Sequence, residues 1–152
     1  MEQKQVKSKQ RVKDFAEVFT AQREVIAMSD LIPKEVYQNL TSTFLEPAVG
    51  YGVFLIEILK RKFSYCKNEK DGLKALNSVY GVDIQADNVA ECRLRLVELY
   101  KEHFPKANDF AILTALAITN NNIVCDDFLN PHTETVKKWK EDSEIKQLSL
   151  FD

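Results

Sequence analysis

The stretch that most constrains the fold runs from Thr43 to Lys60 and reads TFLEPAVGYGVFLIEILK. It predicts a short buried strand over 43–46, a glycine-bearing turn over 47–52, and an amphipathic helix from about Val53. Gly50 and Gly52 let the backbone turn sharply and keep side chains away from an approaching ligand. The start of the helix offers unpaired N–H groups and the positive end of its dipole, which suit a carboxylate or a phosphate. The pattern is typical of the first βα unit of an open nucleotide-binding sheet.

The composition describes one ordinary domain. The chain has 152 residues, of which 45% are hydrophobic and 29% are charged, with a formal net charge of −2. That charge argues against tight electrostatic binding of nucleic acid by this chain alone. There is no signal peptide and no apolar run of transmembrane length. The three cysteines are widely spaced and lack ligand-spaced histidines, so we interpret them as reduced thiols of a cytoplasmic protein.

The glycine turn also carries a resemblance to a known family. The run from Glu46 to Leu55, EPAVGYGVFL, resembles motif I of S-adenosylmethionine-dependent DNA methyltransferases, particularly the adenine-N6 enzymes of restriction–modification systems. A G-x-G turn alone is a weak signal, and an ordinary tight turn of another α/β protein is the alternative. The acid and proline before the turn and the Phe-Leu after it make the match more specific.

A second strand is predicted over about 78–84, and it ends in Asp83, 31 residues after Gly52. A nicotinamide-binding fold usually places its ribose-binding acid about 20 residues on. Gly81-Val82-Asp83-Ile84 resembles motif II, which implies that Asp83 accepts both ribose hydroxyls and that Ile84 packs on the adenine ring. The alternative is that Asp83 caps the following helix, although Asp87 is also available for that task.

A third strand is predicted over 123–125, and Asp126-Asp127-Phe128-Leu129 follows it. This segment resembles motif III, which implies that Asp127 accepts the adenine amine and that Phe128 stacks on the ring. Asp126 stands where the family often has glycine, and it would either crowd the pocket or face water.

Val18-Phe19-Thr20-Ala21 resembles motif X, the segment that lies over the methionine end of the cofactor, with Ala21 in place of the family's proline. A helix cap with an apolar anchor is the alternative interpretation. Together these resemblances imply a set of residues that bind S-adenosyl-L-methionine: Phe19, Thr20, Glu46, Pro47, Ala48, Gly50, Gly52, Phe54, Asp83, Ile84, Asp127 and Phe128.

Helical patterns fill the rest of the chain. We expect a helix over 22–31 that buries Val25, Ile26, Met28 and Leu31, and a turn at Asp71-Gly72. Residues 86–104 predict the clearest helix, with a buried stripe of Val89, Cys92, Leu96, Leu99 and Tyr100. Residues 107–118 are apolar almost all round, which predicts a helix that is buried on several sides or covered by a partner. We divide the chain into a disordered terminus (1–10), a methyltransferase-like domain (11–132), a charged helix anchored by Trp139 (133–146) and a tail (147–152).

The predicted fold class is α/β: a partial Rossmann-like class I methyltransferase fold with a parallel three-stranded sheet, ordered third–second–first and flanked by helices. In the complete fold a fourth strand pairs with the first. Here the first strand is expected to have an open edge, which predicts a covering helix, a second copy or a complementary catalytic chain.

The resemblance stops before the chemistry. The family holds the target adenine with a D/N-P-P-Y/F tetrad, and nothing here matches it. The segment most similar to the tetrad is Asn130-Pro131-His132, and we interpret it as a turn. The chain is therefore expected to bind the cofactor but to be inactive in isolation, as a split or truncated methyltransferase. The alternatives are a non-catalytic interaction module with this fold and a protein that binds another nucleotide.

The carboxyl-terminal residues Gln147-Leu148-Ser149-Leu150-Phe151 resemble the short peptide with which bacterial DNA-processing proteins dock on the sliding clamp. The resemblance implies that Gln147, Leu148, Leu150 and Phe151 contact such a partner. The alternative is that the apolar residues of this tail fold back onto the sheet.

Overall fold

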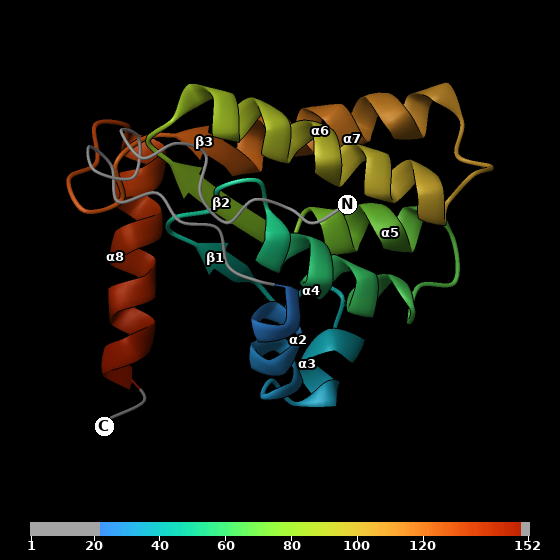
Figure 1. Ribbon diagram of the computed structural model, residues 1–152, viewed down its shortest axis with the longest axis horizontal. Coiled ribbons are helices and arrows are strands. Elements are labelled where there is room, and N and C mark those ends of the chain that lie inside the picture. Colours follow the sequence, from blue (N-terminus) through green and yellow to red (C-terminus); the bar gives the residue numbers. More distant parts are fainter. Residues whose placement is uncertain (1–21, 150–152) are drawn as a thin grey trace.

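The computed structural model describes residues 22–149, and its helices and strands alternate in the manner of an α/β protein (Figure 1). Within these residues no helix is long and apolar enough to cross a membrane. The elements, in chain order, are α2 (Gln22–Asp30), α3 (Lys34–Gln38), β1 (Phe44–Glu46), α4 (Val53–Phe63), α5 (Glu69–Leu76), β2 (Val79–Asp83), α6 (Ala86–His103), α7 (Asp109–Asn122), β3 (Ile123–Cys125) and α8 (Glu134–Ser149).

The three strands form one parallel sheet in the order β1–β2–β3, which confirms the predicted sheet and its strand order. Glu46 lies opposite Gly81, and Asp83 lies opposite Cys125. Because parallel strands end at the same edge of a sheet, the segments that follow β1, β2 and β3 lie side by side. This edge is where open α/β sheets bind ligands.

The two faces of the sheet are covered differently. Val79 and Ile123 are buried in the main core, which they share with residues of α4, α6 and α7. Tyr80 points to the other face, where its ring meets the Trp139 ring of α8 edge to face at 5.2 Å. Val136 of α8 is fully buried and is therefore a deeper anchor than the predicted Trp139. Figure 1 shows α8 standing apart from the group of helices on the opposite side.

The predicted helix over 86–104 is confirmed as α6, with Val89, Cys92, Leu96 and Tyr100 buried and Leu99 partly buried, but two other expectations are wrong. Asp71 and Gly72 lie inside α5, not in a turn. A Cβ atom at Gly72 would come within 2.3 Å of the Phe104 ring, so this glycine serves close helix packing. In α2, Val25 is buried as predicted. The other predicted core residues are exposed: Ile26 and Met28 in α2, and Leu31 just after it.

Within the described residues, no strand pairs with the outer edge of β1. The Phe44 N–H donates to the Ser78 carbonyl on the β2 side at 3.0 Å. Alternate residues of a strand turn their backbone groups in opposite directions, so the N–H and C=O of Leu45 point outward. Pro47 has no N–H group and limits the edge on that side. The predicted open edge is thus present but short.

The amino ends of the strands are held by a buried lysine that the sequence reading overlooked. The Lys62 side chain is fully buried, and its ammonium donates to the carbonyls of Leu40 (3.1 Å) and Ser42 and to the Ser78 hydroxyl (2.7 Å). Burial lowers the pKa of Lys62 to about 8. Lys62 therefore joins α4 to the segments that enter β1 and β2.

Candidate functional site

The glycine turn between β1 and α4 has the backbone that its sequence predicts. Gly50 and Gly52 have φ values of 56° and 85°, a region that side chains disfavour. Gly52 is the N-cap of α4, and no side chain of residues 22–149 caps the helix. Within this range the first amides of α4, which lie beside the turn, are thus not occupied by a capping side chain. This is the geometry that suits an anionic group.

Close packing fixes the turn over the sheet. A Cβ atom at Gly81 would come within 2.7 Å of the Val49 side chain, so only glycine at this position of β2 lets the turn approach. The Val49 N–H donates to the Val82 carbonyl at 2.8 Å. A Cβ atom at Gly52 would meet the Sγ atom of Cys92 at 2.7 Å. Burial raises the pKa of the Cys92 thiol to about 12, so Cys92 acts here as a packing residue.

Asp83 joins the second strand to this turn. Its Oδ2 accepts from the Gly50 N–H at 2.9 Å, and its Oδ1 accepts from the Gln85 N–H at 2.8 Å and the Asn88 side-chain amide at 3.2 Å. The bond to Gln85 is the contact expected if Asp83 caps the start of α6. The bond to Gly50 joins the glycine turn, which resembles motif I, to the strand end that resembles motif II. Ile84, the next residue, is exposed at the same edge.

Glu46, at the end of β1, is a half-buried carboxyl group. Burial raises its pKa, and the bond that it accepts from the Ala48 N–H at 3.1 Å partly opposes this rise. Pro47 and Ala48 are exposed, whereas Phe54 is half-buried in the first turn of α4. Glu46 therefore places an acceptor beside the glycine turn.

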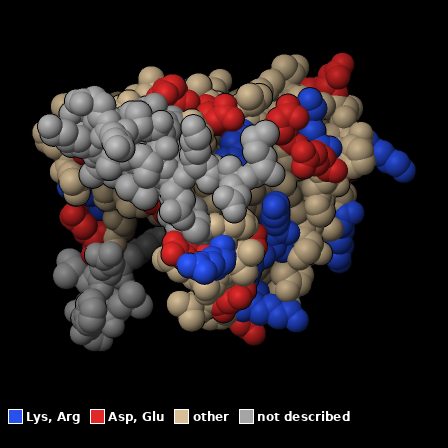
Figure 2. All heavy atoms as spheres, viewed as in Figure 1, with Lys and Arg blue, Asp and Glu red and all other residues tan. Residues whose placement is uncertain are grey.

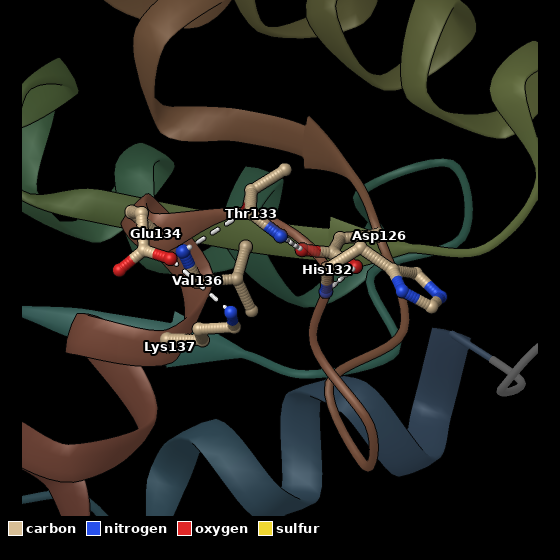
Figure 3. A network of polar contacts seen from close by, with 6 residues as sticks. All are labelled: Asp126, His132, Thr133, Glu134, Val136 and Lys137. Atoms are coloured by element: carbon tan, nitrogen blue, oxygen red, sulfur yellow. Dashed lines mark hydrogen bonds and ion pairs between the residues drawn. The ribbon is translucent and has the colours of Figure 1, made fainter.

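The loop after β3 is organised around Asp126, which lies in a polar network (Figure 3). Asp126 is 6% exposed, so the expectation that it faces water is wrong. Its oxygens accept from the N–H groups of Asp127 (2.7 Å), His132 (2.9 Å) and Thr133 (3.0 Å) and from the Thr133 hydroxyl (2.6 Å). The Thr133 hydroxyl in turn accepts from the Val136 N–H, so Asp126 fixes the start of α8.

These bonds determine the charge of Asp126. Burial alone raises the pKa of this carboxyl, but the bonds from Thr133, His132 and Asp127 outweigh it and hold the pKa well below its usual range. Asp126 is therefore ionised at neutral pH. Asp126 N–H also donates to the Asp83 carbonyl at 3.0 Å, which ties the third segment to the second.

Asp127 and Phe128 are half-buried in this loop. An Asp127 oxygen accepts from the Leu129 N–H at 3.0 Å, and the Lys140 ammonium lies 5.9 Å from the centre of the Phe128 ring. Lys140 also donates to the Leu129 carbonyl at 3.0 Å. The loop that carries both predicted adenine contacts is thus held from α8 as well as from Asp126.

Two residues of α6 that support the turn were missed in the sequence. Asn88 is fully buried and donates to Asp83, and the Arg95 guanidinium donates to the Tyr51 carbonyl at 3.4 Å. The contact of Asn88 could have been predicted, because Asn88 lies in the first turn of the helix that follows Asp83. The contact of Arg95 could not, because it depends on how α6 packs against the glycine turn.

Several predicted residues are not brought into this site. Phe19 and Thr20 lie outside the described residues, as do Leu150 and Phe151. Gln147 and Leu148 belong to α8, which continues to Ser149, three residues beyond the predicted end of the helix. The docking role of the tail stays a prediction. Among the described residues there is no group of side chains that could hold a metal ion.

A pocket of about 490 Å³ lies away from the glycine turn, between the sheet and α8. Leu45 and Tyr80 form its sheet side, and Trp139 forms part of its α8 side. The remaining lining residues are Thr43, Lys138, Asp142 and Ser143. The pocket therefore adjoins the open edge of β1.

Charged side chains of both signs are interspersed on the face drawn in Figure 2, and the described residues in this view form no continuous basic surface. This distribution agrees with the formal net charge of −2. The face drawn in Figure 2 therefore offers no strong attraction for a phosphate backbone.

Comparisons of the chain with protein-family models, curated proteins and solved structures find no match. The functional assignment therefore rests on the motifs in the sequence and on the geometry of the strand ends.

Proposed function

We propose that the chain binds S-adenosyl-L-methionine at the carboxyl ends of its strands, as the cofactor-binding part of an adenine-N6 DNA methyltransferase. The observation that carries this proposal is the hydrogen bond from the Gly50 N–H to the Asp83 carboxylate, at 2.9 Å. It connects the turn that resembles motif I to the strand end that resembles motif II, and the Asp126–Asp83 backbone bond adds the third segment.

In the proposed site, each end of the cofactor meets suitable chemistry. The uncapped start of α4 suits the carboxylate of the methionine part. Asp83 Oδ2 accepts the bond from Gly50, and a carboxylate oxygen can accept a second bond, which is proposed to come from a ribose hydroxyl. Ile84 and Phe128 offer apolar surface to the adenine, and Asp127 offers an acceptor to its amine.

The chain by itself is proposed to transfer no methyl group. Asn130, Pro131 and His132 occupy the loop between β3 and α8, and the His132 N–H is used by Asp126. In the family the base-holding tetrad follows a fourth strand. Within the described residues no fourth strand precedes this loop, so the loop does not correspond to the tetrad. These residues therefore do not supply a base-holding group.

The open edge of β1 favours a split enzyme. A strand running parallel to β1 could bond to the outward N–H and C=O of Leu45, and a side chain of the incoming segment could enter the pocket against Tyr80 and Trp139. Such a strand would end beside Glu46. The partner is thus proposed to be a chain that carries a fourth strand followed by D/N-P-P-Y. Labelled methyl should enter DNA only when both chains are present, and incorporation by this chain alone would contradict the split arrangement.

Calorimetric titration with S-adenosylmethionine and S-adenosylhomocysteine tests the cofactor site. Asp83→Ala should weaken binding by about one to two decades, equivalent to roughly 1.5–3 kcal/mol. Because Asp83 also holds Gly50, this variant is expected to lose stability as well.

A cleaner variant is therefore Phe128→Ala, with Leu129→Ala as its neighbour control, since Leu129 is exposed. Loss of a stacking ring should weaken binding by about tenfold or more, and the control should leave binding unchanged. If neither ligand binds at millimolar concentration, or if Phe128→Ala and Leu129→Ala have equal effects, the proposal is wrong.

A further inference from the structure

Helix α7 presents an apolar face that the rest of the described structure does not cover. Phe110, Leu113 and Leu116 are 78%, 63% and 44% exposed. The helix was expected to be buried on several sides or covered by a partner. It is buried on one side only, through residues such as Ala111, Ala115 and Thr119. Figure 1 shows α7 beside α6 and far from α8.

The exposed residues of α7 occupy one continuous face. At about 100° per residue they fall within a sector of about 140°. Spacings of four, three and four residues occur along this face, as in the contact seam of paired helices. The members of this outer face are Asp109, Phe110, Leu113, Leu116, Ala117, Asn120 and Asn121.

The charges near α7 select an antiparallel arrangement of two copies. Asp109 is the only charged residue from 109 to 122, and it lies at the start of the helix. At the other end, the Arg93 guanidinium donates to the carbonyls of Asn120 (3.2 Å) and Ile123 (2.6 Å), so a positive charge lies there. Two antiparallel copies would bring each Asp109 close to Asn120 and Arg93 of the other copy. Their helix dipoles would then point in opposite directions, which is the favourable arrangement for neighbouring helices. A parallel pair would instead bring the two Asp109 side chains together.

We propose that the outer face of α7 is a self-association surface, on which a second copy of this chain packs antiparallel about a two-fold axis. The axis passes between Leu113 and Leu116, so that each Leu113 contacts the partner copy's Leu116 and Ala117 allows close approach. The surface is self-complementary, as a two-fold interface requires. It is separate from the β1 edge and does not depend on cofactor binding.

The expected affinity is modest. The helix is about 21 Å long, and its outer face can bury only about 400–600 Å² per copy, below the roughly 800 Å² of a standard interface. We therefore expect dissociation constants of about 10–100 μM.

Sedimentation equilibrium of the full chain from 5 to 300 μM (an order-of-magnitude range around that affinity) tests the proposal. Leu113→Glu should weaken association at least about 50-fold, because each copy would bury an unpaired carboxylate. Asp109→Lys should weaken it about 5–10-fold by placing a cation against Arg93. The matched control is Leu31→Glu, an equally simple change at an exposed leucine of the α2 end, and it should associate like the wild type.

Far-UV circular dichroism and thermal unfolding at the lowest concentration should be alike for all four proteins, which separates lost association from lost folding. The proposal is overturned if the wild type stays monomeric throughout the range, if Leu113→Glu still associates, or if Leu31→Glu weakens association equally. Asp109→Lys with unchanged or stronger association would overturn the antiparallel arrangement.

Discussion

Replacing Asp126 with asparagine would test how the loop after β3 is held. The wild-type Oδ2 accepts from both the N–H and the hydroxyl of Thr133, and Oδ1 accepts from Asp127 and His132. In Asp126→Asn, an NH₂ group replaces one carboxylate oxygen. This group cannot accept hydrogen bonds from the donors that face it. The two bonds to the remaining oxygen also become weaker, because the acceptor is no longer charged.

Hydrogen bonds to charged groups contribute roughly 1.5–3 kcal/mol each, and they are not additive. We therefore expect Asp126→Asn to lower the free energy of unfolding by about 3–4 kcal/mol at pH 7. Urea unfolding followed by far-UV circular dichroism measures this difference. Asp127→Asn is the control. Asp127 is half-buried, and within residues 22–149 its carboxylate accepts a single hydrogen bond, from the Leu129 N–H, so this change should cost less than about 1 kcal/mol.

The pH dependence gives a second measurement on the same variant. The pKa of Asp126 is lower in the folded protein than in the unfolded chain. Its contribution to stability is therefore fully present above the unfolded value near 3.9, and it is lost as the pH falls toward the folded value. The stability difference between wild type and Asp126→Asn should be constant from about pH 5 to 8 and should shrink below about pH 4. A cost below 1 kcal/mol at pH 7, or a difference that does not change in acid, would refute this reasoning.

Two further predictions concern buried residues of the frame. Since the folded pKa of Lys62 is lowered to about 8, the unfolded chain binds more protons above that pH. The stability of wild type relative to Lys62→Met should therefore rise between about pH 8 and 10.5, by at most about 3 kcal/mol, as urea unfolding would measure. A stability difference between wild type and Lys62→Met that does not change over this pH range would contradict the lowered pKa. Gly52→Ala should cost about 2 kcal/mol or more, because its φ is 85° and the added Cβ meets Cys92. In a double-mutant cycle, Cys92→Ala should recover part of that loss, and strict additivity would exclude the contact.

The sequence determined the parts of the fold that depend on local pattern. β3 begins with the β-branched residues Ile123 and Val124 and ends at Cys125, and α6 follows its apolar stripe from Ala86 to His103. The glycine turn was also predictable, because Gly50 and Gly52 stand where the backbone takes positive φ values. In each case residues close in the chain carry the signal, through side-chain period or backbone freedom.

Other features were decided only by tertiary structure, because their cause lies far away in the chain. The Asp71-Gly72 pair is typical of a turn, yet Gly72 lies inside α5. Glycine is needed there because the Phe104 ring occupies the space that a side chain would take. Asp126 reads as an extra surface acid, yet it is buried because the residues that begin α8 supply its donors. Lys62 reads as one of three basic residues on α4, but only the packing of that helix against the ends of β1 and β2 provides the carbonyls that allow its burial. Likewise, the pattern of α7 shows that it is apolar, while its packing against α5, α6 and the sheet decides which face remains exposed.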